Sequence, residues 1–147
     1  ADFIKKYFEA FKGVAKYIEE STANARKNGY AETMFGRRRE LPELQSDVAM
    51  VRAAGERMAT NMPVQGTQAD LIKMAMVAVD KALHEAPKDE IKMLLTVHDE
   101  LVFEVKKDRI AYWAPKLKKI IEEIYTLSVP LVVEMKSGDN WTDLDRF

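Results

Sequence analysis

Two short apolar segments, residues 91–97 and 101–105, stand close together in the second half of the chain. Both are rich in Leu, Val and other apolar residues, and their length is typical of β-strands. Only His98, Asp99 and Glu100 separate them, which leaves room for a tight turn and nothing longer. The pattern therefore predicts an antiparallel β-hairpin with three ionisable side chains between strands that are otherwise built to be buried.

Helical spacing of apolar residues dominates the first part of the chain. It predicts a helix over residues 2–12, broken at Gly13, and a second helix that ends at Gly29. A short strand over residues 30–35 is expected next, turned at Gly36.

Polar and proline residues mark the elements in the middle of the chain. Ser46 and Asp47 can cap a helix that runs to about Asn61, and Pro63 cannot continue this helix without a kink. Two amphipathic helices and an edge strand are also predicted: residues 67–85, about 108–125, and 131–135.

The order of these elements predicts the fold class. Helices come first, followed by an antiparallel hairpin, a helix and an edge strand, so we expect an α+β fold. With 147 residues, 47% of them hydrophobic, the chain can form one modest domain, or a domain and part of its neighbour. A helical pattern is already running at Ala1, which we interpret as a fragment or a processed chain.

Composition excludes several classes of protein. The chain has no cysteine, which rules out disulfides and thiolate metal sites and fits a reducing compartment. No segment reaches the roughly 18 unbroken apolar residues of a membrane span, and no signal peptide is predicted. The net charge is −1, so any nucleic-acid site must be local.

The polar tip of the hairpin allows two interpretations. Asp is a common turn residue, so the tip could be a polar turn and nothing more. Alternatively, a carboxylate held rigidly at a hairpin tip could bind Mg²⁺, a hard cation that takes oxygen ligands. Adjacent side chains on extended backbone diverge, so Asp99 and Glu100 are not expected to hold one ion together. A two-metal centre needs at least one further carboxylate from elsewhere.

Three hydrogen-bond donors form a second candidate site. Arg57 and Asn61 are four residues apart and share a helix face, and Gln65 follows just after Pro63. They could be solvent-facing polar residues near a helix end. They could also probe the DNA minor groove, where every Watson–Crick pair presents acceptors at nearly equivalent places. Such donors test the shape of a base pair without reading its sequence.

Arg37, Arg38 and Arg39 form a basic cluster, with Arg26 and Lys27 nearby in sequence. The cluster could be a solvated face, or it could hold phosphates and give salt-dependent, sequence-independent affinity. The remaining residues of note need no special role, namely His84 at a helix end and the core positions Ile72, Met76 and Val79.

Four segments, in the right order, resemble family A DNA polymerases, the bacterial polymerase I-like family. Residues 94–102 (LLTVHDELV) look like the family's motif C, and residues 56–70 (ERMATNMPVQGTQAD) look like the stretch that precedes it. Residues 29–39 (GYAETMFGRRR) resemble the hairpin between fingers and palm, and residues 138–141 (GDNW) resemble the typical ending. The resemblance covers essentially the whole chain.

The resemblance implies a fold and a reaction. Residues 1–45 would be the end of the fingers subdomain and residues 46–147 a portion of the palm, with the hairpin packed by helices. The reaction would be template-directed addition of deoxynucleotides to a primer 3′-hydroxyl by two-metal phosphoryl transfer.

The resemblance also implies roles for the candidate residues. Asp99 would be one of two catalytic aspartates that hold a Mg²⁺ pair, Glu100 a less important acidic neighbour, and His98 would lie beside the primer terminus. The other contacts to nucleic acid would come from Arg57, Asn61 and Gln65 in the minor groove, and from Arg39 and Arg37 on the backbone.

Two motifs of the family are absent from the sequence. These are the Asp-x-Ser-x-x-Glu-like strand with the other catalytic aspartate and the Arg-x3-Lys-x6-Tyr-Gly-like helix that grips the nucleotide. No exonuclease region is present either. We therefore expect the chain to be inactive alone and to work with the N-terminal part of a polymerase, primer–template DNA and deoxynucleoside triphosphates.

The expected location is the bacterial cytoplasm, at the nucleoid and without a membrane partner; an organelle or phage origin stays open. Two alternative hypotheses also stay open: a stand-alone DNA-binding or structural remnant without catalysis, and an unrelated α+β domain with a chance acidic turn.

Overall fold

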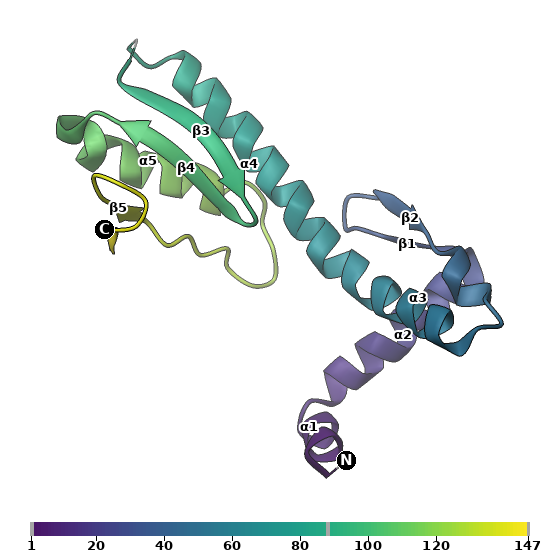
Figure 1. Ribbon diagram of the computed structural model, residues 1–147. Coiled ribbons are helices and arrows are strands. Elements are labelled where there is room, and N and C mark those ends of the chain that lie inside the picture. Colours follow the sequence, from purple (N-terminus) through teal and green to yellow (C-terminus); the bar gives the residue numbers. More distant parts are fainter. Residues whose placement is uncertain (1, 88, 147) are drawn as a thin grey trace. The chain divides into compact units, whose positions relative to one another are not determined.

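The computed structural model describes residues 2–87 and 89–146 (Figure 1). Contacts between residues divide the chain into two compact units, Ala1–Gln68 and Ala69–Phe147. Each unit has its own cluster of buried apolar side chains.

The first unit is mainly helical. Its elements are α1 (Asp2–Ala10), α2 (Lys12–Asn28), β1 (Tyr30–Glu32), β2 (Arg38–Glu40), the 3-10 helix η1 (Pro42–Gln45), α3 (Ala49–Asn61), the π-helix η2 (Met62–Gly66) and the start of α4 (Thr67–His84). Strands β1 and β2 pair antiparallel, with Ala31 opposite Arg39.

Gly29 ends α2, as the sequence predicts. It adopts the left-handed conformation, with φ 82°, and its N–H donates to the carbonyl of Ala25 at 2.8 Å. Glycine adopts this conformation without steric cost. The predicted break at Gly13 is wrong, because the break lies at Phe11 (φ −114°, ψ 62°) and Gly13 lies inside α2. A glycine permits a break but does not enforce one.

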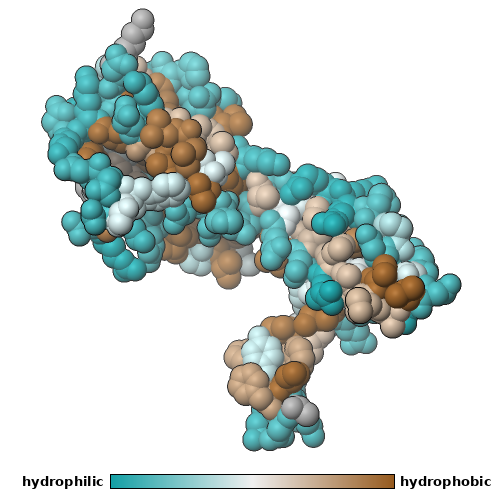
Figure 2. Space-filling view, viewed as in Figure 1, coloured by the Kyte–Doolittle hydropathy of each residue, from teal (hydrophilic) through white to brown (hydrophobic). Residues whose placement is uncertain are grey.

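The core of the first unit joins α2, the β1–β2 hairpin, η1 and α3. Its buried residues are Ala25, Ala31, Leu41, Leu44 and Ala59, with Met58 and Met62 packed against them. Helix α1 contributes no buried residue. It carries exposed apolar side chains. Helix α1 is the purple N-terminal helix of Figure 1, and Figure 2, drawn from the same side, shows apolar and hydrophilic residues side by side on it.

The start of α3 differs from the prediction. The residue before the helix is Val48, and no side chain caps the helix end. The hydroxyl of Ser46 instead accepts the N–H of Val48 at 3.2 Å, within the preceding bend. The carbonyl of Ser46 accepts a hydrogen bond of 2.8 Å from the guanidinium of Arg52. Ser46 and Asp47 therefore lie outside the helix that they were expected to cap.

The second unit contains the longer hairpin. Its elements are most of α4, β3 (Ile91–Val97), β4 (Glu100–Val105), the 3-10 helix η3 (Lys107–Arg109), α5 (Ile110–Glu122), β5 (Lys136–Ser137) and β6 (Asp145–Arg146). Strands β3 and β4 pair antiparallel as predicted, and so do the two short strands β5 and β6. In Figure 1 the β3–β4 hairpin lies along α5.

One face of the β3–β4 hairpin packs on helices. Its core has the buried residues Val79, Ile91, Trp113 and Leu117, with half-buried partners that include Met93, Phe103 and Val105. The pairing slips between Met93 and Leu95, which leaves Leu94 as an extra residue of a β-bulge. At the bulge Leu94 is 52% and Leu95 43% exposed, whereas Val97, Leu101 and Val102 beyond it are half-buried. The prediction that both strands are built to be buried is therefore wrong for Leu94 and Leu95 in this chain.

Residues 131–135 do not form the predicted strand. Their exposure alternates as in a strand, but no described residue pairs with them in a β-ladder. The N–H of Val133 donates instead to the carboxylate of Glu122 at 2.9 Å. Alternating exposure requires only two different faces, whereas a strand also requires a partner for its backbone.

The α+β class is confirmed, because the described residues combine helices with two-stranded antiparallel sheets. The assignment of residues 1–45 and 46–147 to fingers and palm remains a prediction. No helix within residues 2–87 and 89–146 is long and apolar enough to cross a membrane.

Candidate functional site

The tip of the β3–β4 hairpin is a two-residue turn. Val97 pairs directly with Glu100, so only His98 and Asp99 connect the strands. His98 has φ 53°, in the left-handed region that non-glycine residues seldom adopt. Such outliers concentrate at functional sites, where the surrounding structure holds them. The strand pairing thus holds the Asp99 backbone within a turn of only two residues.

The side chains of His98, Asp99 and Glu100 are all exposed. The oxygens of Asp99 have the right chemistry for a hard divalent cation. Within the described residues, however, no group of three or more His, Asp or Glu side chains could hold a metal ion. The tip can therefore offer one carboxylate ligand, and a complete metal site needs ligands from outside these residues.

Arg57, Asn61 and Gln65 occupy the α3–η2 segment of the first unit, and all three are exposed. Arg57 makes no hydrogen bond or ion pair with another described residue, whereas its neighbour Glu56 forms an ion pair with Arg26. The donors of this group therefore face solvent and can reach a ligand.

Pro63 does not end the helical path. The chain passes from α3 through the π-helix η2 directly into α4. Proline lacks an N–H and its ring crowds the preceding turn, and a π-helix accommodates it by widening the backbone. Gln65 therefore belongs to a continuous helical segment, not to the loop after a helix stop.

The three arginines of the basic cluster have different surroundings. The guanidinium of Arg37 donates to the carbonyl of Gly66 at 2.8 Å. Arg38 pairs with Glu32 at 3.1 Å and lies 4.3 Å from the ring centre of Tyr30. Arg39 is exposed, and its guanidinium reaches the sulfur of Met58 at 3.3 Å. Arg38 is thus held by its own hairpin, and Arg39 lies beside the helix that carries Arg57.

The candidate residues fall in two groups, one in each unit. Arg37, Arg39, Arg57, Asn61 and Gln65 belong to Ala1–Gln68, and the hairpin tip belongs to Ala69–Phe147.

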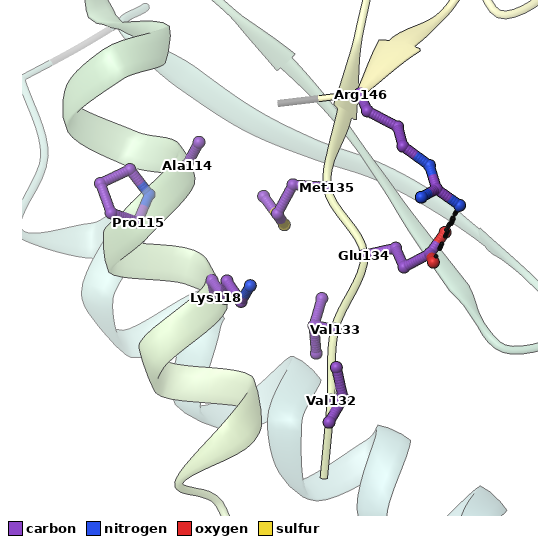
Figure 3. A pocket seen from close by; sticks show the side chains of 8 residues that line it. All are labelled: Ala114, Pro115, Lys118, Val132, Val133, Glu134, Met135 and Arg146. Atoms are coloured by element: carbon purple, nitrogen blue, oxygen red, sulfur yellow. Dashed lines mark hydrogen bonds and ion pairs between the residues drawn. The ribbon is translucent and has the colours of Figure 1, made fainter.

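Two hollows of the second unit hold none of the candidate residues. A pocket of about 340 Å³ lies between α5 and the extended segment before β5 (Figure 3). The ion pair between Glu134 and Arg146 lies at its edge. Its lining residues are Ala114, Pro115, Lys118, Val132, Val133, Glu134, Met135 and Arg146. A second hollow lies against α4 and includes Lys73 and Val77. The candidate chemistry is therefore on exposed surfaces.

Sequence patterns did not reveal the contacts that support η2. Tyr17 and Thr67 donate to backbone carbonyls of this region, in addition to Arg37. The only signal available was Pro63 itself, because a proline within a helical pattern leaves carbonyls that need other donors.

Comparisons with known proteins show the family of the chain. The sequence model of DNA polymerase family A matches residues 1–143. The chain is 49% identical over 139 residues to the thermostable DNA polymerase I of Thermus aquaticus, which covers 95% of this chain and 16% of that protein. It is 44% identical over 143 residues to DNA polymerase I of Deinococcus radiodurans, covering 97% of this chain and 15% of that protein.

A solved structure is similar in fold as well. It is the POL domain of Pol1 from M. smegmatis in complex with DNA primer-template and dNTP, with a TM-score of 0.81 and 44% identity. The similarity covers 87% of this chain and 22% of that one. The chain thus spans about a sixth of the length of the relatives named above. With the family model matched almost from end to end, the chain belongs to DNA polymerase family A.

Proposed function

We propose that this chain is the C-terminal part of a DNA-directed DNA polymerase and carries one catalytic carboxylate of its active site. In the complete enzyme, the primer 3′-hydroxyl attacks the α-phosphate of a deoxynucleoside triphosphate, and pyrophosphate leaves. The enzyme would serve DNA replication and repair in the bacterial cytoplasm, at the nucleoid.

The observation that carries this proposal is the geometry of Asp99 within a chain of this family. Its side chain is exposed and stands on a two-residue turn between hydrogen-bonded strands. A group on a short turn between paired strands is held more firmly than one on a long loop, as catalysis requires.

Mg²⁺ fits the chemistry of this carboxylate, and Asp99 is the residue that would bind it. When bound, a Mg²⁺ pair supplies the charge that lowers the pKa of the primer hydroxyl and stabilises the departing pyrophosphate. The other carboxylate of the site would come from the N-terminal part of the polymerase. Glu100 begins β4 and contributes negative charge near the tip, and His98 would contact the primer end.

The first unit would hold the duplex. Arg57, Asn61 and Gln65 would donate hydrogen bonds to the purine N3 and pyrimidine O2 atoms that every correct pair presents in the minor groove. Arg39 would contact a backbone phosphate, and Arg37 adds positive charge beside it. Arg38 would not contact a phosphate, because its guanidinium already pairs with Glu32 and lies over the ring of Tyr30.

A chimera tests the proposal. This chain would replace the matching segment of the Thermus aquaticus polymerase, to which it is 49% identical. We expect templated primer extension with Mg²⁺ and all four nucleotides, and none when that segment is deleted. If the chimera melts cooperatively and binds primer–template DNA but does not extend it, the chain is a DNA-binding module and the proposal is wrong.

A further inference from the structure

We infer that Arg37 is a positioning residue: it fixes the π-helix η2, and through it Gln65, and does not contact phosphate. This inference rests on the proposed function of Gln65 at the minor groove. It replaces the backbone contact that the sequence alone suggests for Arg37.

The π-helix needs support from outside itself. Pro63 has no N–H to donate, and the wider turn changes the hydrogen bonding of neighbouring carbonyls. A carbonyl left without a partner on folding is destabilising by about 1–3 kcal/mol. Side-chain donors to the carbonyls near η2 therefore help to stabilise this segment.

Three side chains supply such donors, from α2, from α4 and from the turn between β1 and β2. The hydroxyl of Tyr17 in α2 donates to the carbonyl of Thr60 at 2.8 Å, just before η2. The hydroxyl of Thr67 donates to the carbonyl of Pro63. The guanidinium of Arg37 donates to the carbonyl of Gly66 at 2.8 Å, at the last residue of η2. Tyr17 and Arg37 thus hold the two ends of the segment that presents Gln65.

The turn that carries Arg37 is itself fitted against η2. Thr33 is buried, and its hydroxyl accepts the N–H of Arg37 at 3.2 Å. The N–H of Met34 donates to the hydroxyl of Thr67 at 2.9 Å. A Cβ atom on Gly66 would lie 2.6 Å from a methyl carbon of Thr33, a distance that real contacts do not reach. The close approach of turn and π-helix therefore requires glycine at this position.

Gln65 is the exposed residue next to the Gly66 carbonyl that Arg37 holds. A shift of the Gly66 peptide would turn the Gln65 backbone and move the amide that donates to the minor groove. Hydrogen bonds to bases depend strongly on angle and distance. A displaced Gln65 amide would therefore discriminate less well between matched and mismatched base pairs. Arg37 would influence the duplex only through this geometry.

The two roles predict different measurements. A phosphate contact lowers the affinity for every duplex and contributes about one to the slope of log K against log salt. A positioning residue leaves that slope unchanged and reduces the preference for matched over mismatched primer ends. Arg52 provides a matched control, because its guanidinium also donates to a backbone carbonyl, that of Ser46, at 2.8 Å.

The experiment compares Arg37→Gln with Arg52→Gln. In the 147-residue chain, amide hydrogen exchange should become roughly tenfold faster over residues 64–67 in Arg37→Gln alone, as expected for a lost charged hydrogen bond. In the chimera, Arg37→Gln should lower the match-to-mismatch extension ratio about as much as Gln65→Ala. The double variant should be no worse than either single variant, and the salt slope should stay at the parent value.

Unchanged exchange over residues 64–67, or a salt slope smaller by about one, would overturn the inference and restore the phosphate contact. Additive losses in the double variant would also overturn it, because Arg37 would then act independently of Gln65. A chimera that extends no primer would remove the proposed function, whereas the exchange result would still report on the Arg37–Gly66 contact.

Discussion

Val97 and Glu100 are direct cross-strand partners, so Glu100 belongs to β4 and Asp99 to the turn. Successive side chains of a strand point to opposite faces, and this rule applies to Glu100 but not to the turn residue Asp99. Asp99 and Glu100 are adjacent in sequence but therefore occupy different structural positions. Under the proposed function, Asp99 is the one that would enter a shared metal site, and Glu100 would contribute to the surrounding charge.

The isolated chain should bind Mg²⁺ weakly. Asp99 supplies one carboxylate, and Mg²⁺ gives up its bound waters reluctantly. Calorimetric titration should therefore give a dissociation constant of about a millimolar or weaker. Micromolar binding that disappears in Asp99→Asn would mean that this chain contains further ligands.

Arg57→Ala and Gln65→Ala should change fidelity and not sequence preference. Both side chains would donate to acceptors that all correct pairs share, so their loss weakens the preference for matched primer ends alike in every sequence. Extension of matched and mismatched primers by the chimera measures this, with roughly a tenfold loss of discrimination expected for one lost bond of about 1–2 kcal/mol. A loss confined to particular base pairs would contradict the minor-groove assignment.

Much of the fold follows from local patterns in the sequence. The apolar spacing in α5 buries Trp113 and Leu117, and Gly29 ends α2 because only glycine adopts its conformation without cost. Two apolar segments separated by three residues predict the hairpin and its polar tip. The turn itself has only two residues, because Glu100 belongs to β4.

Other features depend on contacts between distant residues. Pro63 lies in a π-helix, and donors such as Tyr17 and Arg37 support it there. Residues 131–135 alternate like a strand, but a strand also requires a partner that no local pattern can supply. The left-handed conformation of His98 belongs to the two-residue turn that the register of β3 and β4 creates, and this register joins residues on two strands.

Leu117→Ala should destabilise the second unit by about 2–5 kcal/mol, because it leaves a cavity beside Val79 and Trp113. Val129→Ala, at a residue that is 63% exposed, should change stability by less than about 0.5 kcal/mol. Urea unfolding followed by tryptophan fluorescence reports on this unit, since Trp113 and Trp141 are the only tryptophans of the chain. Equal midpoints for the two variants would show that the core has been assigned wrongly.

Arg39→Ala in the chimera should weaken binding to all duplexes alike and reduce the salt slope by about one. Arg38→Ala is the control, because its charge is already paired with Glu32 at 3.1 Å and its loss should leave the slope nearly unchanged. Binding across a salt series measures both variants. If Arg38→Ala alone lowers the slope, the phosphate contact belongs to Arg38.

The most direct test of the account is the turnover of the chimera with Asp99→Asn, compared with Asp89→Asn. Asp89 is an exposed turn residue of the same unit, with φ 64°, and it pairs with Lys92 at 3.4 Å. Both changes keep the size of the side chain and remove one negative charge. Single-turnover primer extension should fall by roughly a hundredfold or more in Asp99→Asn, with primer–template affinity within about threefold of the parent, and should stay near normal in Asp89→Asn. Near-normal extension by Asp99→Asn would contradict the assignment of Asp99 as a catalytic carboxylate of a polymerase.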